Sequence, residues 1–459
     1  MSRLISIVLL GLTAATSLAE EPATLDEARQ LWQTGKYAEG LDAFDALAKA
    51  LPEADAKTKS RIALGRADCL ASQGEYDKAV EALTPLATAP EPSADVLARL
   101  AEIQLGRGLW DDAEANARRA LKVDPDHLAT RWVVARLDEA RGQNEQALKT
   151  CQWIVDRRNA RAAEFRKNAD ALVIVGQAAE RNARARFRGE ELADELNTVI
   201  NEIYEAALEV DPRCWQAAWL EGRLFLAGYR EGSARQELFR ALKINPQAAE
   251  VIVTLGQVDL QGYKLADGRR KGNEALEINP HFAPAHVLLV DLNISDERFD
   301  DALKSARKAV AENPRDQDAL ARLAASYRLL VNPVGAFAAE QVALASNPRP
   351  STFYAALGER LADRRKYLSA ERAFLLATVA DPERADARIG LGMLYMQVGR
   401  EDEAQALFAA AFDADPFNVR AFNQMKVLKH MTAYRPVTTD HFSVLVEPKQ
   451  DALLGKYMS

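Results

Sequence analysis

The sequence predicts an all-α protein in which pairs of helices stack side by side into a right-handed α-solenoid. Three observations lead to this prediction: prolines recur every 34 residues, an alanine stands five residues before each proline, and each proline follows an Ala-rich apolar run. Proline ends a helix because it lacks an N–H group and disfavours helix in the residue before it. The recurring positions are Pro212, Pro246, Pro280, Pro314, Pro348, Pro382 and Pro416, with Ala207, Ala241, Ala275, Ala309, Ala343, Ala377 and Ala411 before them.

Length and composition agree with such an array. At 459 residues the chain is too long for one ordinary core, and its 48% hydrophobic and 27% charged residues argue against global disorder. A single helix pair leaves an apolar face in water, so neighbouring pairs must stack. Small Ala and Gly side chains let paired helices approach closely, and larger Tyr and Phe side chains fill the adjacent holes.

Small, turn, aromatic and terminal residues recur at fixed places within each unit. The clearest copy reads ARIGLGMLYMQVGREDEAQALFAAAFDADP, with Gly392, Gly399, Ala404, Phe408, Ala411 and Pro416 at these places. Other copies supply Gly358, Tyr367, Ala370, Phe374, Ala377 and Pro382, and near the N-terminus Gly35, Tyr37, Phe44, Pro52, Gly74, Tyr76, Ala79, Gly108, Trp110, Ala113, Ala120 and Pro125. The pattern resembles the tetratricopeptide repeat, a 34-residue helix–turn–helix family, over nearly the whole mature chain.

Counting in this register gives about eleven repeats, a capping helix and a short truncated α/β tail. Phe422, Met425 and Leu428 are expected to seal the last repeat. The boundaries that we expect are 1–19 for a signal peptide, 24–161 for N-terminal repeats, 162–214 for a lengthened Arg-rich repeat, 215–418 for six regular repeats, 419–431 for the capping helix, and 432–459 for a linker and the start of a truncated further domain.

The first residues, MSRLISIVLLGLTAATSLAEE, have the layout of a secretory signal. Arg3 precedes an apolar run from Leu4 to Leu18, and small residues stand at the expected cleavage site after Ala19. We therefore expect an exported protein, periplasmic or extracellular, with no integral membrane span after signal removal. A retained N-terminal anchor is the alternative.

Charge and cysteine usage narrow the partners and cofactors. The net charge of −8, or −9 without Arg3, disfavours nucleic acid as a partner. Cys69, Cys151 and Cys214 are far apart and lack C-x-x-C spacing, so neither a zinc site nor a redox motif is indicated. They are expected as small buried side chains, although a disulfide between two of them remains open in an oxidising compartment.

The sequence contains none of the catalytic signatures that we sought. It has no H-E-x-x-H, no G-x-S-x-G and no phosphate-binding G-x-x-x-x-G-K-[ST]. His281 and His286 are five residues apart with Pro284 between them, which favours turn positions over a metal site. We therefore expect a chain that is not an enzyme and binds no cofactor or metal.

The family resemblance implies a concave surface that binds a protein or peptide, with contacts from the first helix of each repeat. Trp132 with Arg136, and Trp219 with Arg223, repeat one pairing four residues apart on a helix face. The alternative is that each tryptophan packs between repeats and an arginine covers it. The expected contact residues are Trp132, Arg136, Trp219, Arg223, Gln257, Asp291, Arg328, Glu359 and Met393.

The lengthened interval is rich in arginine within an acidic protein. One interpretation is a basic patch that docks an acidic partner. The other is a solvated helix face whose arginines pair with Glu190, Glu191, Asp194 and Glu195. The patch comprises Arg157, Arg158, Arg161, Arg181, Arg184, Arg186 and Arg188.

The tail differs from the helices before it. FSVLVE alternates like a short strand, and DALLGKYMS is typical of the first turns of a helix. A lone strand and part of a helix cannot bury a core, so we expect a second domain that the sequence enters without completing. Its opening resembles the start of a gluzincin-type peptidase domain. The alternative is a tail that folds back on the last helix.

These observations lead to two hypotheses about function. The first is a non-catalytic scaffold that binds a protein or peptide on the concave surface of the solenoid. The second is a substrate-presenting or regulatory arm of an exported zinc metallopeptidase whose catalytic domain lies beyond Ser459.

Overall fold

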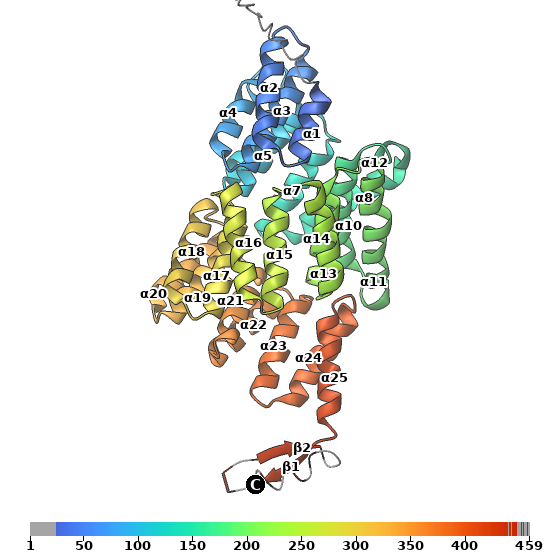
Figure 1. Ribbon diagram of the computed structural model, residues 1–459. Helices are drawn as coiled ribbons and strands as arrows, with labels where there is room; N and C mark the ends of the chain where they lie inside the picture. The colour runs from blue at the N-terminus through green and yellow to red at the C-terminus, as the bar shows by residue number, and fades with distance from the viewer. Residues whose placement is uncertain are drawn as a thin grey trace, which may run out of the picture.

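The computed structural model describes residues 24–438, 440–441, 443–447, 451, 453 and 457, and these residues form an α-solenoid of stacked helix pairs (Figure 1). The predicted fold class is confirmed. In Figure 1 the N-terminal pairs lie at the top, α13–α16 in the middle, and α23–α25 with the two strands at the bottom. The expected signal peptide at residues 1–19 lies outside the described residues.

Eleven helix pairs and one final helix make up the described array. The first helices of the pairs are α1 (Leu25–Gln33), α3 (Ala56–Ser72), α5 (Ala94–Gly106), α7 (Leu128–Ala140), α10 (Ala169–Arg186), α13 (Trp215–Ala227), α15 (Ala249–Gln261), α17 (Ala283–Ser295), α19 (Gln317–Leu329), α21 (Ser351–Asp363) and α23 (Ala385–Gln397). The second helices are α2 (Tyr37–Ala50), α4 (Tyr76–Ala87), α6 (Trp110–Val123), α8 (Asn144–Ala160), α11 (Gly189–Thr198) continued by η1 (Val199–Tyr204) and α12 (Glu205–Val210), α14 (Glu231–Ile244), α16 (Leu265–Ile278), α18 (Phe299–Glu312), α20 (Pro333–Ser346), α22 (Tyr367–Ala380) and α24 (Glu401–Ala414). A short helix, α9 (Ala162–Phe165), precedes α10, and α25 (Val419–Met431) closes the array.

Each second helix of the regular repeats ends at an Asn or Asp directly before the repeat proline. Its side-chain oxygen accepts the N–H two residues further on, which turns the chain into the next first helix. Representative distances are 3.0 Å from His281 N to Asn279 Oδ1 and 3.1 Å from Glu383 N to Asp381 Oδ1.

Small residues and aromatic rings complement each other between helices, as expected. The seven alanines five residues before the prolines are all 0% exposed. A Cβ added at Gly392 would lie 2.8 Å from the ring of Phe408, so only glycine leaves room for this ring. Cys69, Cys151 and Cys214 are buried free thiols, and burial raises the pKa of Cys69 and Cys214 to about 12.

The superhelix closes so tightly that one turn packs on the next. The turn glycines of the first four pairs contact asparagines about 205 residues further along the chain. A Cβ on Gly74 or Gly108 would lie 2.5 Å from Oδ1 of Asn279 or Asn313, respectively. The same relation joins Gly35 to Asn245, and Gly142 to Asn347.

Hydrogen bonds strengthen this contact between turns of the superhelix. Asn279 Nδ2 donates to the hydroxyl of Tyr76 at 3.0 Å, and Asn313 Nδ2 donates to the carbonyl of Gly106 at 3.0 Å. Aspartate at these positions would keep the local turn but would lack the N–H donor. The D-P endings bind distant repeats as acceptors instead: Asp211 accepts from Gln33 at 2.6 Å, and Asp415 accepts from Arg184 at 2.9 Å.

Five later turns adopt the same backbone without glycine. The equivalent positions Tyr229, Tyr263, Glu297, Val331 and Arg365 also have left-handed backbone, with φ from 55° to 60°. These non-glycine residues accept a strain of about 1 kcal/mol. At the turns of the first four pairs a side chain would also collide with an asparagine, so glycine is required there on two grounds.

The lengthened repeat and the tail depart from the regular pattern. Residues 162–214 hold α9, α10 and a long second helix with a π-helical segment, η1. Beyond α25, β1 (Arg435–Thr438) pairs antiparallel with β2 (Ser443–Val446). The strand expected at FSVLVE coincides with β2, whereas β1 was not expected. Most of DALLGKYMS lies outside the described residues, and the resemblance to a gluzincin-type domain stays a prediction.

The capping helix packs as the sequence indicated, with one exception. In α25, Leu428 is buried and Met425 packs against the core. Phe422 remains partly exposed and stacks on Phe412, with Lys426 over its ring.

Glycine-to-alanine substitutions test the packing between turns. Gly108 and Gly399 both have left-handed backbone, with φ of 73° and 78°, but only Gly108 faces an asparagine; a Cβ on Gly399 meets nothing within 4 Å. We expect Gly399→Ala to cost about 1 kcal/mol of unfolding free energy, and Gly108→Ala to cost about 2–4 kcal/mol, because it adds a collision to the same strain. Urea unfolding followed by circular dichroism measures both, and equal costs would contradict the packing.

Candidate functional site

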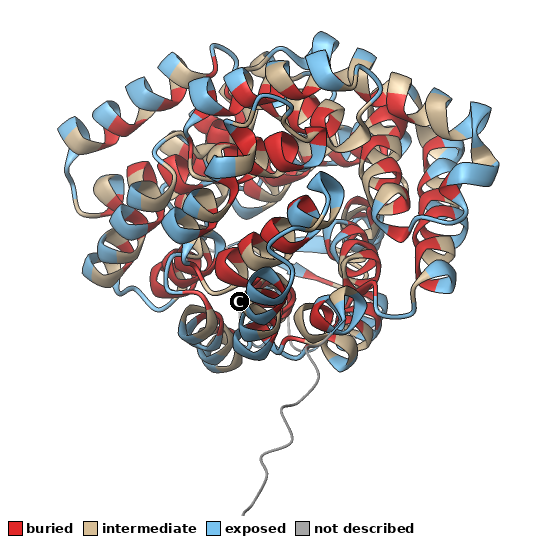
Figure 2. Ribbon diagram, turned by 90° about the horizontal axis from the view of Figure 1, so that it is seen from above, coloured by how far each residue is buried: buried red, intermediate tan, exposed pale blue. Residues whose placement is uncertain are grey.

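The first helices form the inner wall of the superhelix. Figure 2 shows the helix pairs following one another around the axis. First helices from distant repeats face each other here: Arg29 of α1 binds Asp170 of α10 at 2.6 Å, and Glu250 of α15 lies close enough to Arg99 of α5 to interact electrostatically. We call the surface that these helices turn toward the axis the inner wall.

Ion pairs run along the inner wall from repeat to repeat. A carboxylate on one first helix binds an arginine on the next first helix or, for Asp291 with Arg360, on the one after that, so the steps tie nearby pairs together. The steps are Asp68 with Arg99 at 2.8 Å, Glu102 with Arg136 at 3.5 Å, Glu139 with Arg181 at 3.0 Å, Asp291 with Arg322 at 3.0 Å, and Asp291 with Arg360 at 3.6 Å.

Asp291 illustrates the electrostatics of these steps. Burial would raise the pKa of its carboxyl group, but Arg322 and Arg360 outweigh burial and lower the pKa below its ordinary value. The carboxylate is therefore ionised and its charge is already balanced. Such a group stabilises the wall and is poorly available to a ligand.

The ladder of ion pairs is interrupted at α13 and α15. Arg223 of α13 is exposed and makes no ion pair, and its guanidinium lies 5.1 Å from the ring centre of Trp219. Trp219 is half-buried, and its indole N–H donates to Thr254 of α15 at 2.9 Å. Among the described residues, the Glu250 side chain of α15 makes no hydrogen bond or ion pair with another residue; burial raises the pKa of its carboxyl group, and Arg99 partly opposes this effect. We call Trp219, Arg223, Glu250 and Thr254 the ladder gap.

Positive charge concentrates beside the ladder gap. Burial lowers the pKa of the Arg136 guanidinium; Glu102 opposes this effect, while Arg181 and Arg223 lower the pKa further. Three arginines from α7, α10 and α13 therefore interact across this part of the wall. An anionic group placed here would relieve their repulsion.

The two predicted Trp–Arg pairs differ in their placement. Trp132 is only 4% exposed, and the guanidinium above it, 4.7 Å from the ring centre, belongs to Arg181 of the next repeat rather than to Arg136. Its surroundings match the alternative in which tryptophan packs between repeats. In the second pair Trp219 is half-buried and Arg223, over its ring, is exposed.

The remaining predicted contact residues are scattered over several environments. Gln257 is half-buried on α15, and Asp291 forms the ion pair with Arg322 described above. Arg328 pairs with Glu340 of its own repeat. Glu359 is half-buried, and burial raises its pKa. Met393 packs against the core. Reasoning by register missed Arg99, Arg322, Arg360 and Glu250, although acids and arginines about one repeat apart carry the signal.

The arginines of the lengthened repeat are mostly paired, but not with the acids that the sequence suggested. Most of the partners lie on other helices, because α8 and α10 face earlier and later repeats rather than the start of α11; Glu180 lies on α10 itself. The ion pairs are Arg157 with Asp126, Arg161 with Glu164, Arg181 with Glu139, Arg184 with Glu180 and Asp415, and Arg188 with Glu383; Arg186 binds Gln152 and Arg158 binds Asn159. Two of these pairs tie α10 and its following loop to the C-terminal repeats.

One acidic cluster among the described residues has the spacing of a metal site. Carboxylate oxygens of Glu205, Glu221 and Glu237 lie within 4.8 Å of one another. Arg240 already occupies the cluster, with Nη1 2.6 Å from Glu205 and Nη2 3.1 Å from its second oxygen. The guanidinium supplies the positive charge that a cation would bring. His281 lies at a turn and binds Glu312 at 2.8 Å.

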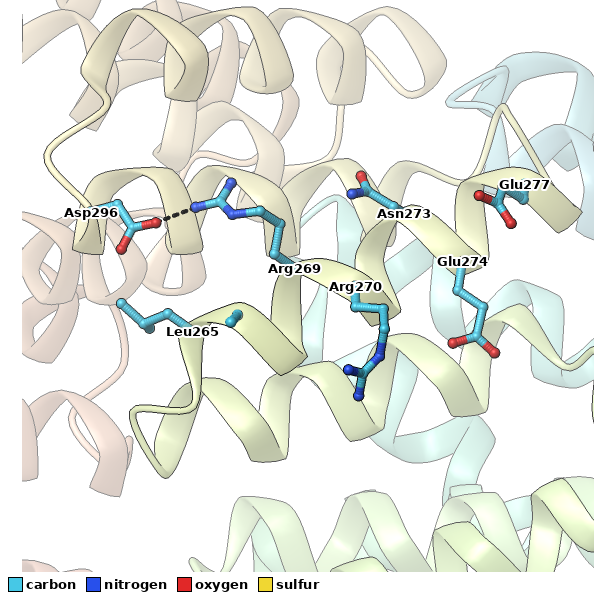
Figure 3. A pocket seen from close by; sticks show the side chains of 8 residues that line it. Leu265, Arg269, Arg270, Asn273, Glu274, Glu277 and Asp296 are labelled. Carbon is cyan, nitrogen blue, oxygen red and sulfur yellow. Dashed lines mark hydrogen bonds and ion pairs between the residues drawn. The ribbon is translucent and has the colours of Figure 1, made fainter.

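A hollow of about 840 Å³ lies on the outer helix α16 (Figure 3). Its lining comes almost wholly from one face of α16, and Asp296 closes one end. Arg269 binds Asp296 and donates to Asn293 at 2.6 Å, so its charge is already balanced by neighbouring side chains. The hollow is wide, open and lined by polar groups.

The acidic cluster predicts how stability responds to pH. Burial, together with the charges of Glu205 and Glu237, raises the pKa of Glu221 to about 9. The folded state then holds a proton that the unfolded chain releases near pH 4.5, so wild-type stability should fall as pH rises from about 5 to 9. Glu221→Gln should flatten this fall. The melting temperatures of both proteins, measured at a series of pH values, test this prediction. The same dependence on pH in wild type and Glu221→Gln would contradict the raised pKa of Glu221.

Comparisons with known proteins agree with the repeat architecture. The family model described as Tetratricopeptide repeat matches residues 25–91, 99–159, 201–249, 288–349 and 355–419, which together exceed half of the chain. No curated protein matches. No helix within the described residues is long and apolar enough to cross a membrane.

Several solved structures match this chain at low sequence identity. YrrB, described as a TPR protein with an unusual peptide-binding site, is 21% identical over 41% of this chain and 97% of its own, with a TM-score of 0.25. Yeast Tom70 is 14% identical over 95% of this chain and 98% of its own, with a TM-score of 0.32. PilF of Pseudomonas aeruginosa is 16% identical over 46% of this chain and 97% of its own, with a TM-score of 0.30. On the family match, the chain belongs to the tetratricopeptide repeat family.

Proposed function

We propose that this protein is a non-catalytic scaffold that binds an acidic segment of a partner polypeptide at the ladder gap. Tetratricopeptide repeat proteins bind proteins or peptides, which supports a polypeptide as the ligand. The observation that carries the proposal is Arg223, which is exposed and makes no ion pair in the described structure, over the half-buried Trp219, in a stretch of the inner wall where the ion-pair ladder is interrupted.

The chemistry of the ladder gap favours an acidic segment with an apolar neighbour. The Arg223 guanidinium needs no internal bond to be broken before it binds a carboxylate, so binding there avoids the cost of separating an existing ion pair. The ring of Trp219 offers a flat apolar surface beside it, and tryptophan and arginine are frequent among the strongest contacts of interfaces. Glu250, on the neighbouring helix, would bind a backbone N–H or a basic side chain of the same segment.

Two variants test the proposal. We expect Arg223→Gln to weaken binding of acidic 12-residue peptides about tenfold or more, because it removes the free cation, while leaving the fold intact. Arg270→Gln is the matched control, since Arg270 is an exposed arginine on the outer helix α16. Fluorescence anisotropy with acidic, neutral and basic peptides of equal length measures the affinities.

The salt dependence of the same assay adds a second readout. Affinity for the acidic peptides should fall between 50 mM and 200 mM salt, since exposed charges are screened over about 10 Å. Equal binding of all three peptide classes, or equal loss in the two variants, would count against the ladder gap.

A further inference from the structure

A second surface lies on the outside of the superhelix, on the outer helices α20 and α22. Their sequences are PVGAFAAEQVALAS and YLSAERAFLLATVA, whereas the preceding outer helices read LADGRRKGNEALEI and FDDALKSARKAVAE. Outer helices normally present charge to water. We call the exposed apolar side chains on α20 and α22 the outer strip: Val334, Phe337, Val342, Leu368, Leu375 and Val379, which are 43–85% exposed.

The stacking of repeats changes at the outer strip. Among the described pairs, α20 approaches the next first helix, α21, less closely than any other second helix approaches its successor, and α19 packs directly on α21 instead. Phe353 and Tyr354 of α21 fill the wider interval, and the Tyr354 hydroxyl donates to Glu340 at 2.9 Å. The helix α20 therefore stands out from the array with its apolar flank uncovered.

The free charge at the outer strip is positive. Arg372 lies within the strip, and Arg365 and Lys366 lie at the start of α22; none of the three makes an ion pair in the described structure. The only acids of the two helices are already bound. Glu340 pairs with Arg328, and Glu371 binds Arg400 at 2.7 Å.

The strip is also hollowed. A depression of about 280 Å³ on α22 is lined by Leu368, Glu371, Arg372, Leu375, Leu376 and Val379. It is large enough for one or two projecting aliphatic side chains. Each of the two helices has 14 residues, or about 21 Å of length, which matches four turns of a partner helix.

We propose that the outer strip docks an amphipathic helix of a partner protein, with apolar residues on one face and acidic residues at its margin. The apolar face would cover Phe337, Leu368 and Val379, and the acidic margin would meet Arg372, Arg365 and Lys366. This is the helix-in-groove mode of recognition, in which residues at i, i+3, i+4 and i+7 supply the anchors. The site is separate from the ladder gap and does not depend on it.

The positive charge of the outer strip argues against a second copy of this chain as the occupant. A two-fold interface brings the same patch onto itself, so Arg372 and its neighbours would face cations with no free acid to balance them. An anionic lipid surface would satisfy the cations, but it offers no projecting side chain for the depression on α22. A protein helix satisfies both features.

Two designed peptides serve as probes. Both are 18-residue amphipathic helices with the same leucine face; one has glutamate and the other lysine along the polar margin. The proteins are wild type, the double variant Leu368→Gln/Val379→Gln, Arg372→Glu and the control Tyr263→Gln. Tyr263 is 85% exposed, as Leu368 is, but lies in the turn before α16. All substituted side chains are exposed, so circular dichroism should show unchanged folding.

The proposal predicts that wild type binds the acidic peptide at least about tenfold more tightly than the basic one. The double variant and Arg372→Glu should each lose about tenfold or more, while Tyr263→Gln and Arg223→Gln should bind as wild type does. Hydrogen exchange should slow in α20 and α22 on binding. Any of four results would overturn the proposal: equal affinity for both peptides, equal loss in the Tyr263 control, binding of phosphatidylglycerol vesicles without peptide binding, or dimers in sedimentation that the double variant abolishes.

Discussion

The packing of one superhelical turn on the next is the constraint on which the rest of this structure depends. Each helix pair is rotated from its neighbour by a similar amount, so a turn of one repeat returns to the same side of the axis about six repeats later. At the meetings of the first four pairs, an asparagine side chain lies so close to the turn that a Cβ would collide with it. The turn glycines of the first four pairs therefore contact the asparagines that end later repeats.

This closure gives the two faces of the protein different chemistry. The inner wall is surrounded by other repeats, so its charges are costly unless paired, and the ladder of ion pairs meets that requirement. The ladder gap is the exception: Arg223 makes no ion pair in the described structure, and burial raises the pKa of Glu250 on the adjacent helix. The outside faces water and carries ordinary charged helices, except at α20 and α22, where a change in stacking leaves apolar side chains uncovered. Both proposed binding surfaces are local departures from the repeating pattern.

The repeats themselves could be predicted from the sequence, because proline, alanine and aromatic positions act within one helix pair and its neighbour. The contact between turns could not, since Gly74 and Asn279 are brought together only by the accumulated rotation of six repeats. At the candidate site, the Trp219–Arg223 pair lies together as the spacing indicated, with Trp219 half-buried, whereas Trp132 is covered by Arg181 from the next repeat rather than by Arg136. Strand β1 was missed because a pair of short strands has little periodicity to detect.

The central claim is that turns distant in sequence bind each other, and a double-mutant cycle on Tyr76 and Asn279 tests it most directly. Tyr76→Phe removes the hydroxyl, and Asn279→Asp keeps the acceptor for the local turn while removing the N–H donor. The two residues are 203 positions apart. If the turns touch, the changes in unfolding free energy should couple by about 1 kcal/mol. Additive effects, with no coupling, would mean that the superhelix is open and that its turns do not meet.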